Sequence, residues 1–127
     1  MLLATADPDL RLSLELFFDE QPGVQIVGTT SEGNGLRALM HTTRSHLILA
    51  DWDLPGLPLL AVIDEARQMQ PPITTIIMVN SGEGFEPARD SGADAIVLKG
   101  TPPVHLLTVF KQLQRKIISS QETGKYE

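Results

Sequence analysis

Short runs of apolar residues alternate with longer segments of mixed polarity along the whole chain. Three of the short runs are nearly continuous Ile, Val, Leu and Met, which is typical of strands that are buried on both faces of a parallel sheet. The pattern predicts five strands, at Leu2–Thr5, Val24–Val27, Leu47–Ala50, Thr75–Val79 and Ala95–Leu98.

The segments between these strands carry apolar residues at helical spacing, which predicts helices that pack on the sheet. The inward-facing sets are Leu10, Leu14, Phe17 and Phe18; Leu36, Leu39 and Met40; Leu59, Val62, Ile63 and Ala66; and Leu106, Phe110, Leu113 and Ile117. Asp9 is expected to cap the first helix, because its carboxylate can accept hydrogen bonds from free backbone N–H groups. Residues 84–91 are few and include Gly and Pro, so we expect a single turn there.

Strands that alternate with helices predict an α/β fold, because parallel neighbours need a crossover connection that packs back on the sheet. For this number of elements we expect the flavodoxin-like, three-layer, doubly wound arrangement with strand order 2-1-3-4-5. One domain is expected over residues 1–118. Residues 119–127 are polar and are expected to form a flexible C-terminal tail or the start of a linker.

The composition is that of an ordinary globular domain and excludes several kinds of site. Of the 127 residues, 42% are hydrophobic and 20% are charged, and the net charge is −6. This acidic balance argues against direct contact with nucleic acid or with an anionic membrane. The chain has no cysteine, which excludes disulfides and thiolate sites. It shows neither a basic, apolar leader nor an apolar run of membrane-spanning length, so a cytoplasmic location is expected.

Polar residues at the carboxyl ends of the predicted strands form the candidate functional site. In an open parallel sheet, ligands bind beyond these strand ends, at the point where the strand order reverses. Asp51 follows the third strand, Asn80 and Ser81 follow the fourth, and Lys99 follows the fifth. The sequence therefore predicts that a carboxylate, an amide, a hydroxyl and an ammonium group gather at one edge of the sheet.

Asp51 is the candidate nucleophile of this group. A carboxylate at the mouth of a buried strand is partly desolvated, and aspartate is among the residues that accept a phosphoryl group covalently. Such a transfer needs in-line positioning and neutralisation of charge, normally by a divalent cation and a basic side chain. Lys99 is the basic candidate, and Asp51 and Asp53 are candidate Mg²⁺ ligands. Asn80 and Ser81 are placed to donate hydrogen bonds to a phosphoryl oxygen.

Several short motifs fall on these elements in a recognisable order. They are Pro8-Asp9-Leu10-Arg11, Pro22–Gly28, Asp51-Trp52-Asp53-Leu54-Pro55-Gly56, Ser91–Lys99 and Lys99-Gly100-Thr101-Pro102. Together they resemble the CheY-like receiver domain of bacterial two-component response regulators, over nearly the whole chain. The second and last motifs are most similar to the subfamily that often carries a C-terminal helix-turn-helix of the LuxR/NarL type. The resemblance implies that Asp51 is the phosphoacceptor and Lys99 the active-site lysine, in a signalling protein and not in a conventional enzyme.

The chain departs from the receiver pattern at the positions that usually hold Mg²⁺. Receivers usually place an acidic pair after the first strand, where Thr5 and Ala6 stand here, and Asp7 is acidic but lies one place later. Loss of a supporting residue around a metal ligand lowers metal affinity about 10–100-fold, so loss of a direct carboxylate is expected to weaken Mg²⁺ binding at least as much. Asn80 stands where Ser or Thr is usual, and Ile96 stands where receivers carry an aromatic switch residue.

Two modes of action are open for a chain of this kind. In the first, Asp51 takes a phosphoryl group, with Asp7 or water replacing the missing Mg²⁺ ligands. In the second, the chain is a pseudo-receiver that acts as a protein-interaction module without phosphorylation. A histidine kinase or another signalling protein is the expected partner in both. A homodimer through the last helix is a further expectation, because Leu107, Val109 and Ile118 form a second apolar stripe on it.

A flavodoxin-like binder of a small ligand is the alternative from a different class. Such a protein carries its Gly-, Ser- and Thr-rich phosphate loop after the first strand, and Thr5-Ala6-Asp7-Pro8 does not supply one. The segment Gly28–Gly35 is rich in glycine, but it lacks the spacing and the Lys of a phosphate-binding loop. We expect it to be a flexible loop.

Overall fold

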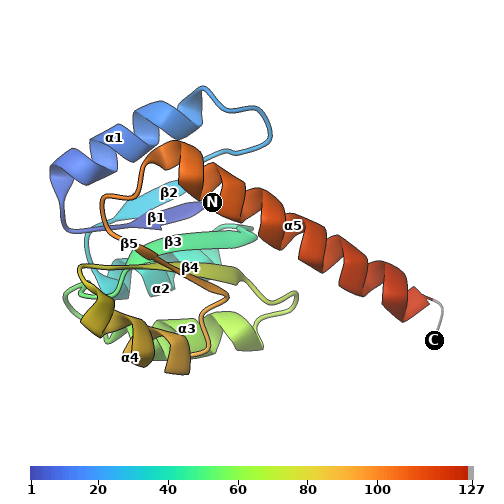
Figure 1. Ribbon diagram of the computed structural model, residues 1–127. Coiled ribbons are helices and arrows are strands. Elements are labelled where there is room, and N and C mark those ends of the chain that lie inside the picture. Colours follow the sequence, from blue (N-terminus) through green and yellow to red (C-terminus); the bar gives the residue numbers. More distant parts are fainter. Residues whose placement is uncertain (126–127) are drawn as a thin grey trace.

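Five parallel strands form a single sheet in the order β2-β1-β3-β4-β5 (Figure 1). The structure is a computed structural model that describes residues 1–125, with side chains described as far as Arg115. Along the chain, the elements are β1 (Leu2–Ala4), α1 (Pro8–Asp19), β2 (Gly28–Thr30), α2 (Gly33–Thr42), β3 (Leu47–Asp51), α3 (Leu59–Gln68), β4 (Thr74–Val79), the 3₁₀ turn η1 (Gly82–Gly84), α4 (Phe85–Asp90), β5 (Ala95–Leu98) and α5 (Pro103–Lys125). The predicted α/β class and the strand order are confirmed.

Helices cover both faces of the sheet and bury two separate apolar clusters. Helices α1 and α5 lie on one face, and α2, α3 and α4 lie on the other (Figure 1). Leu3 of β1 belongs to the cluster of Phe18 and Phe110, on the side of α1 and α5. Leu2 points the other way, into the cluster of Leu36 from α2. Burial on both faces explains why three of the strands are nearly continuous apolar runs.

The predicted inward faces of the helices are confirmed. Every residue of those sets whose side chain is described is buried or half-buried, and Ile117 lies beyond the described side chains. Four of the five strands begin and end within one residue of the predicted positions. None of the helices in the described part of the chain is both long and apolar enough to cross a membrane.

The predicted position of the second strand is wrong. The ladder with β1 is formed by Gly28–Thr30 and not by Val24–Val27. The preceding segment still runs beside β1, because the N–H group of Val27 donates to the carbonyl of Met1 at 2.9 Å. Gly28 is paired with Leu2. A Cβ atom at this glycine would lie only 3.0 Å from a methyl group of Leu39, so the missing side chain lets α2 pack against the edge of the sheet.

The expected flexible loop over Gly28–Gly35 is also wrong, because six of these eight residues belong to the strand β2 or to the start of α2. A Cβ atom at Gly33 would lie 2.1 Å from the backbone oxygen of Leu57. The N–H group of Gly33 also donates to the carbonyl of Pro55 at 2.8 Å. Glycine at position 33 therefore allows the backbones of α2 and of the segment around Leu57 to approach closely, and it does not make this segment flexible.

The first helix is capped by Asp7 and not by Asp9. The Oδ1 atom of Asp7 accepts hydrogen bonds from the backbone N–H groups of Asp9, at 3.0 Å, and Leu10, at 3.1 Å. Proline is favoured at the first helical position because it has no N–H group to satisfy. Pro8 takes that position, so the residue before it becomes the cap and Asp9 falls in the first turn.

The fourth helical segment and the C-terminal segment differ from the simplest expectation. The single turn expected over residues 84–91 is η1 followed by the six-residue helix α4. Helix α5 continues as far as Lys125, into the segment predicted to be a flexible tail. Because side chains beyond Arg115 lie outside those described, the end of the folded domain at residue 118 stays a prediction.

Candidate functional site

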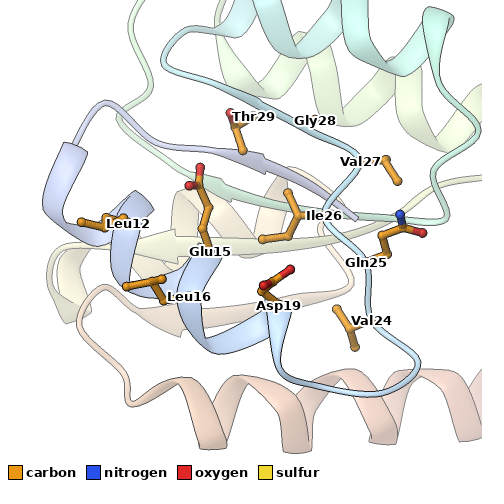
Figure 2. A pocket seen from close by; sticks show the side chains of 10 residues that line it. All are labelled: Leu12, Glu15, Leu16, Asp19, Val24, Gln25, Ile26, Val27, Gly28 and Thr29. Carbon is orange, nitrogen blue, oxygen red and sulfur yellow. The ribbon is translucent and has the colours of Figure 1, made fainter.

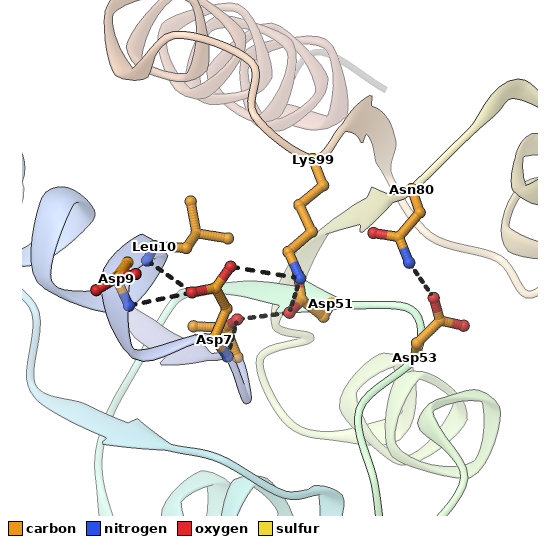
Figure 3. Close-up of polar contacts among 8 residues, drawn as sticks. Asp7, Asp9, Leu10, Asp51, Asp53, Asn80 and Lys99 are labelled. Carbon is orange, nitrogen blue, oxygen red and sulfur yellow. Dashed lines mark hydrogen bonds and ion pairs between the residues drawn. The ribbon is translucent and has the colours of Figure 1, made fainter.

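Asp51 is the last residue of β3 and lies at the centre of a small polar group at the carboxyl edge of the sheet. Only 6% of its surface is exposed. The hydroxyl of Thr5 donates to its Oδ2 atom at 2.5 Å, and the Nζ atom of Lys99 lies 3.4 Å from the same oxygen. Both carboxylate contacts of Asp51 are therefore made by a single oxygen (Figure 3).

Thr5 is a member of this group that the sequence analysis did not identify as a site residue. It follows β1 directly, and it is fully buried. Its hydroxyl oxygen accepts from the N–H group of Asp7 at 3.1 Å while it donates to Asp51. A threonine hydroxyl has one proton to donate, so this contact uses it fully. The signal that could have identified Thr5 was its position, at the end of the strand next to β3.

Lys99 brings a positive charge between two carboxylates. Its backbone N–H group donates to the carbonyl of Val79 at 2.7 Å, which ties the end of β5 to the end of β4. Its Nζ atom lies 3.9 Å from Oδ2 of Asp7, in addition to its contact with Asp51. The following residue, Gly100, has a φ of 91°, a conformation that glycine adopts readily. The structure thus brings Asp51, Lys99 and Asp7 together.

Asn80 and Asp53 form a second, separate pair at the same edge. The Nδ2 atom of Asn80 donates to Oδ2 of Asp53 at 2.6 Å, and both residues are exposed (Figure 3). Ser81 is exposed and precedes η1, without a side-chain hydrogen bond to that turn. Within the described residues, none of these three side chains makes a hydrogen bond or an ion pair with Asp51.

The second carboxylate oxygen of Asp51 has no partner. The Oδ1 atom is buried and accepts no hydrogen bond from any described residue. A buried polar atom without a partner costs about 1–3 kcal/mol, and more when the group is charged. Such an atom is uncommon in a folded protein and marks the place where the site is electrostatically incomplete.

Comparison with known proteins identifies the fold. No family model matches the chain. A transcriptional regulatory protein of Bacillus subtilis, YhcZ, is 33% identical over 101 residues, which cover 77% of this chain and 47% of that protein. The nitrate/nitrite response regulator NarL of Escherichia coli is 29% identical over 114 residues, which cover 88% of this chain and 53% of that protein.

A solved structure agrees with these relatives. The isolated receiver domain of RcsB from Salmonella enterica, determined with the phosphomimetic BeF₃⁻, superposes with a TM-score of 0.78. The alignment has 18% identity and covers 90% of this chain and 86% of that chain. The chain has the fold of a response-regulator receiver domain. It spans about half the length of the curated relatives it matches.

The residues at this edge of the sheet do not fit a ready-made site for Mg²⁺. Mg²⁺ takes near-octahedral oxygen ligands, usually one or two carboxylates together with waters. Oδ1 of Asp51 is the one buried carboxylate oxygen at the site that is left without a partner among the described residues. The Asp7 carboxylate is used by the helix cap and Lys99, and the Asp53 carboxylate is held by Asn80. Among the described residues, no three His, Cys, Asp or Glu side chains are grouped closely enough to hold a metal ion.

Proposed function

We propose that this chain is a receiver domain that acts in two-component signalling as a protein-interaction module. Thr5 and Lys99 hold Asp51, which does not receive a phosphoryl group with the help of Mg²⁺. The observation that carries the proposal is the hydrogen bond from the Thr5 hydroxyl to Oδ2 of Asp51. A neutral donor stands where receivers usually present a carboxylate to the metal, and the ammonium group of Lys99 lies against the same oxygen. Both contacts to Oδ2 of Asp51 are thus supplied by the protein itself.

Phosphorylation of Asp51 is the second candidate function, and a specific feature favours it. The unpartnered Oδ1 atom of Asp51 is a carboxylate oxygen available for bond formation, and Lys99 is near enough to neutralise charge on a bound phosphoryl group. In this case the domain is a phosphoacceptor that catalyses its own phosphoryl transfer and hydrolysis, with a weak Mg²⁺ site that includes Asp51, Asp53 and Asp7.

The partner in either case is a histidine kinase or another signalling protein. The relatives named above are regulators, and one solved relative of Staphylococcus aureus is described as a DNA-binding response regulator of the LuxR family. The net charge of −6 supports a role for this domain in protein contacts and not in nucleic-acid contact. Pairing of two copies through α5 stays a prediction. Leu107 and Val109 are half-buried, and Ile118 lies beyond the described side chains.

The decisive experiment compares the reaction of Asp51 with acetyl phosphate in the presence and absence of Mg²⁺. Intact-mass measurement would detect a phosphoryl adduct, and beryllofluoride titration followed by NMR would detect the corresponding complex. We expect neither in the natural sequence. We expect both to form, and only with Mg²⁺, when the acidic pair is restored by Thr5→Asp together with Ala6→Asp. Ala6 is exposed, so Ala6→Asp alone provides a variant that leaves the core untouched.

Asp51→Asn is the control that assigns any adduct to its residue. A Mg²⁺-dependent adduct that forms on the natural sequence and is lost in Asp51→Asn would contradict the first proposal and establish the phosphoacceptor. An adduct that forms only on the variant with the restored acidic pair, and only with Mg²⁺, would support the first proposal.

A further inference from the structure

A groove lies between α1 and the outer edge of the sheet, away from the group around Asp51. Its volume is about 670 Å³. One wall is formed by Leu12 and Leu16 of α1, and the other by residues 24–29, which lead into and form part of β2 (Figure 2). The exposed fractions of Leu12, Leu16 and Val27 are 57%, 63% and 43%. Three large apolar side chains therefore face solvent around one hollow, where a single exposed leucine would be unremarkable.

The strand that lines this groove is an edge of the sheet. β2 is hydrogen-bonded to β1 on one side, and no other described strand pairs with it. Proteins normally protect such edges with Lys, Pro, a bulge or a covering segment, because unpaired backbone groups recruit further strands. Residues 24–30 read Val-Gln-Ile-Val-Gly-Thr-Thr and contain neither a charged residue nor a proline. The edge has a sequence that can accept another strand.

The charges around the groove are negative. Glu15 and Asp19 of α1 line it together with the two leucines, and no Lys or Arg does so. Glu15 has one weak contact with Arg11 of the same helix, at 3.9 Å. The last turn of α1 has no basic residue, although the C-terminal end of a helix carries a partial negative charge that favours cations. A positively charged ligand would therefore relieve an unfavourable arrangement at Asp19.

We propose that this groove binds an extended segment of a partner protein that presents both basic and apolar side chains to α1 and adds to the sheet next to β2. Addition of a strand to an exposed edge supplies backbone hydrogen bonds, while side-chain pockets supply specificity. In an extended segment, every second side chain points to the same side. The side chains that face α1 must therefore include an apolar residue, which covers Leu12 and Leu16, and a basic residue, which approaches Glu15 and Asp19. A second copy of this acidic domain is disfavoured as the occupant, because its net charge of −6 would meet the same sign.

The test uses a fluorescent peptide that repeats Val-Val-Lys-Lys, so that each side of the extended peptide presents both valine and lysine. It is titrated into the whole chain. We expect anisotropy to report binding that weakens with added salt, and NMR to show shifts of the backbone amides of residues 24–30. Asp19→Asn should weaken binding about two- to five-fold. Leu16→Ser should weaken it at least about tenfold, because it removes the most exposed of the three apolar side chains at the groove. The peptide with alternate backbone amides N-methylated should not bind, because it lacks the donors for strand addition.

Leu60→Ser and Asp64→Asn are the matched controls. Leu60 is 53% exposed, and both residues lie on α3, which covers the other face of the sheet. Binding that is reduced only by the groove variants and by N-methylation supports the proposal. Failure of the lysine–valine peptide to bind, or equal losses in the control variants, would overturn it. Self-association of the chain that disappears in Leu16→Ser without any peptide would also overturn it, since the occupant would then be a second copy.

Discussion

The contact between Thr5 and Asp51 gives the sharpest prediction about the site, through the variant Thr5→Val. Valine has nearly the same shape, so the substitution removes the hydroxyl without opening a cavity in this fully buried position. Asp51 then keeps only the ion pair with Lys99, and its Oδ1 atom already lacks a partner. A hydrogen bond to a charged group contributes about 1.5–3 kcal/mol. We expect the free energy of unfolding at neutral pH to fall by about this amount.

Thr75→Val is the matched control for this variant. Thr75 is also a buried threonine of the sheet, with 1% of its surface exposed, but its hydroxyl lies 3.5 Å from the carboxylate of Asp94. A contact at that distance is at the limit of hydrogen bonding, so we expect a cost below about 1 kcal/mol. For a chain of this length, 1 kcal/mol corresponds to roughly 3–6 °C in Tm, so thermal unfolding should separate the two variants clearly.

Urea denaturation of Thr5→Val in the natural background and in Asp51→Asn forms a double-mutant cycle. We expect the cost of Thr5→Val to shrink by about 1 kcal/mol or more when Asp51 is neutral, because the hydroxyl then no longer meets a charge. If Thr5→Val costs no more than Thr75→Val, or if its cost is the same in both backgrounds, then the Thr5 hydroxyl does not stabilise the Asp51 carboxylate and the basis of the proposed function fails.

Three further predictions concern the framework around the site. Gly33→Ala should lower the free energy of unfolding in urea by about 1–3 kcal/mol, because its Cβ atom would meet a backbone oxygen, whereas Gly82→Ala, with open space around it, should cost far less. Asp7→Ala should lower the free energy of unfolding by about 0.5–2 kcal/mol through loss of the cap, which is clearly more than the loss in Asp9→Ala. Thermal unfolding measures both variants, and the opposite order would show that Asp9 is the cap. Hydrogen bonding to His41, with a further contribution from Arg37, lowers the pKa of Glu65 below its ordinary value. The contribution of Glu65 to stability is therefore present above the ordinary carboxyl pKa and is lost as pH falls through the lowered pKa. Glu65→Gln should lower the free energy of unfolding by about 0.2–1 kcal/mol at neutral pH and not at all in acid. An equal loss at both pH values would refute the assignment.

The sequence by itself determined the architecture and the position of the central residue. Continuous apolar runs and helical spacing follow from burial on both faces of a sheet, which is a local property of each segment. Alternation of strands and helices then restricts the topology, because crossover connections have one hand. Asp51 was identified for the same reason, since it directly follows a buried strand and the carboxyl ends of parallel strands share one edge.

Tertiary structure decided the features that depend on contacts between segments that are distant in the chain. At Gly28, the first residue of β2, Leu39 of α2 packs closely against the strand. The residues around Gly28 in the sequence give no indication of where Leu39 lies. Asp7, a candidate metal ligand by its charge, serves as a helix cap because Pro8 takes the first helical position.

The pairing of Thr5 with Asp51 depends on the register of two strands that are far apart in the chain. Ala4 of β1 pairs with Ala50 of β3, so the next residue of each strand falls at the same edge of the sheet. There the Thr5 hydroxyl meets a carboxylate 46 positions away. Periodicity within one segment carries no information about register between segments, which is set by packing of the whole sheet. The sequence therefore identified Asp51, and only the folded chain determined what holds it.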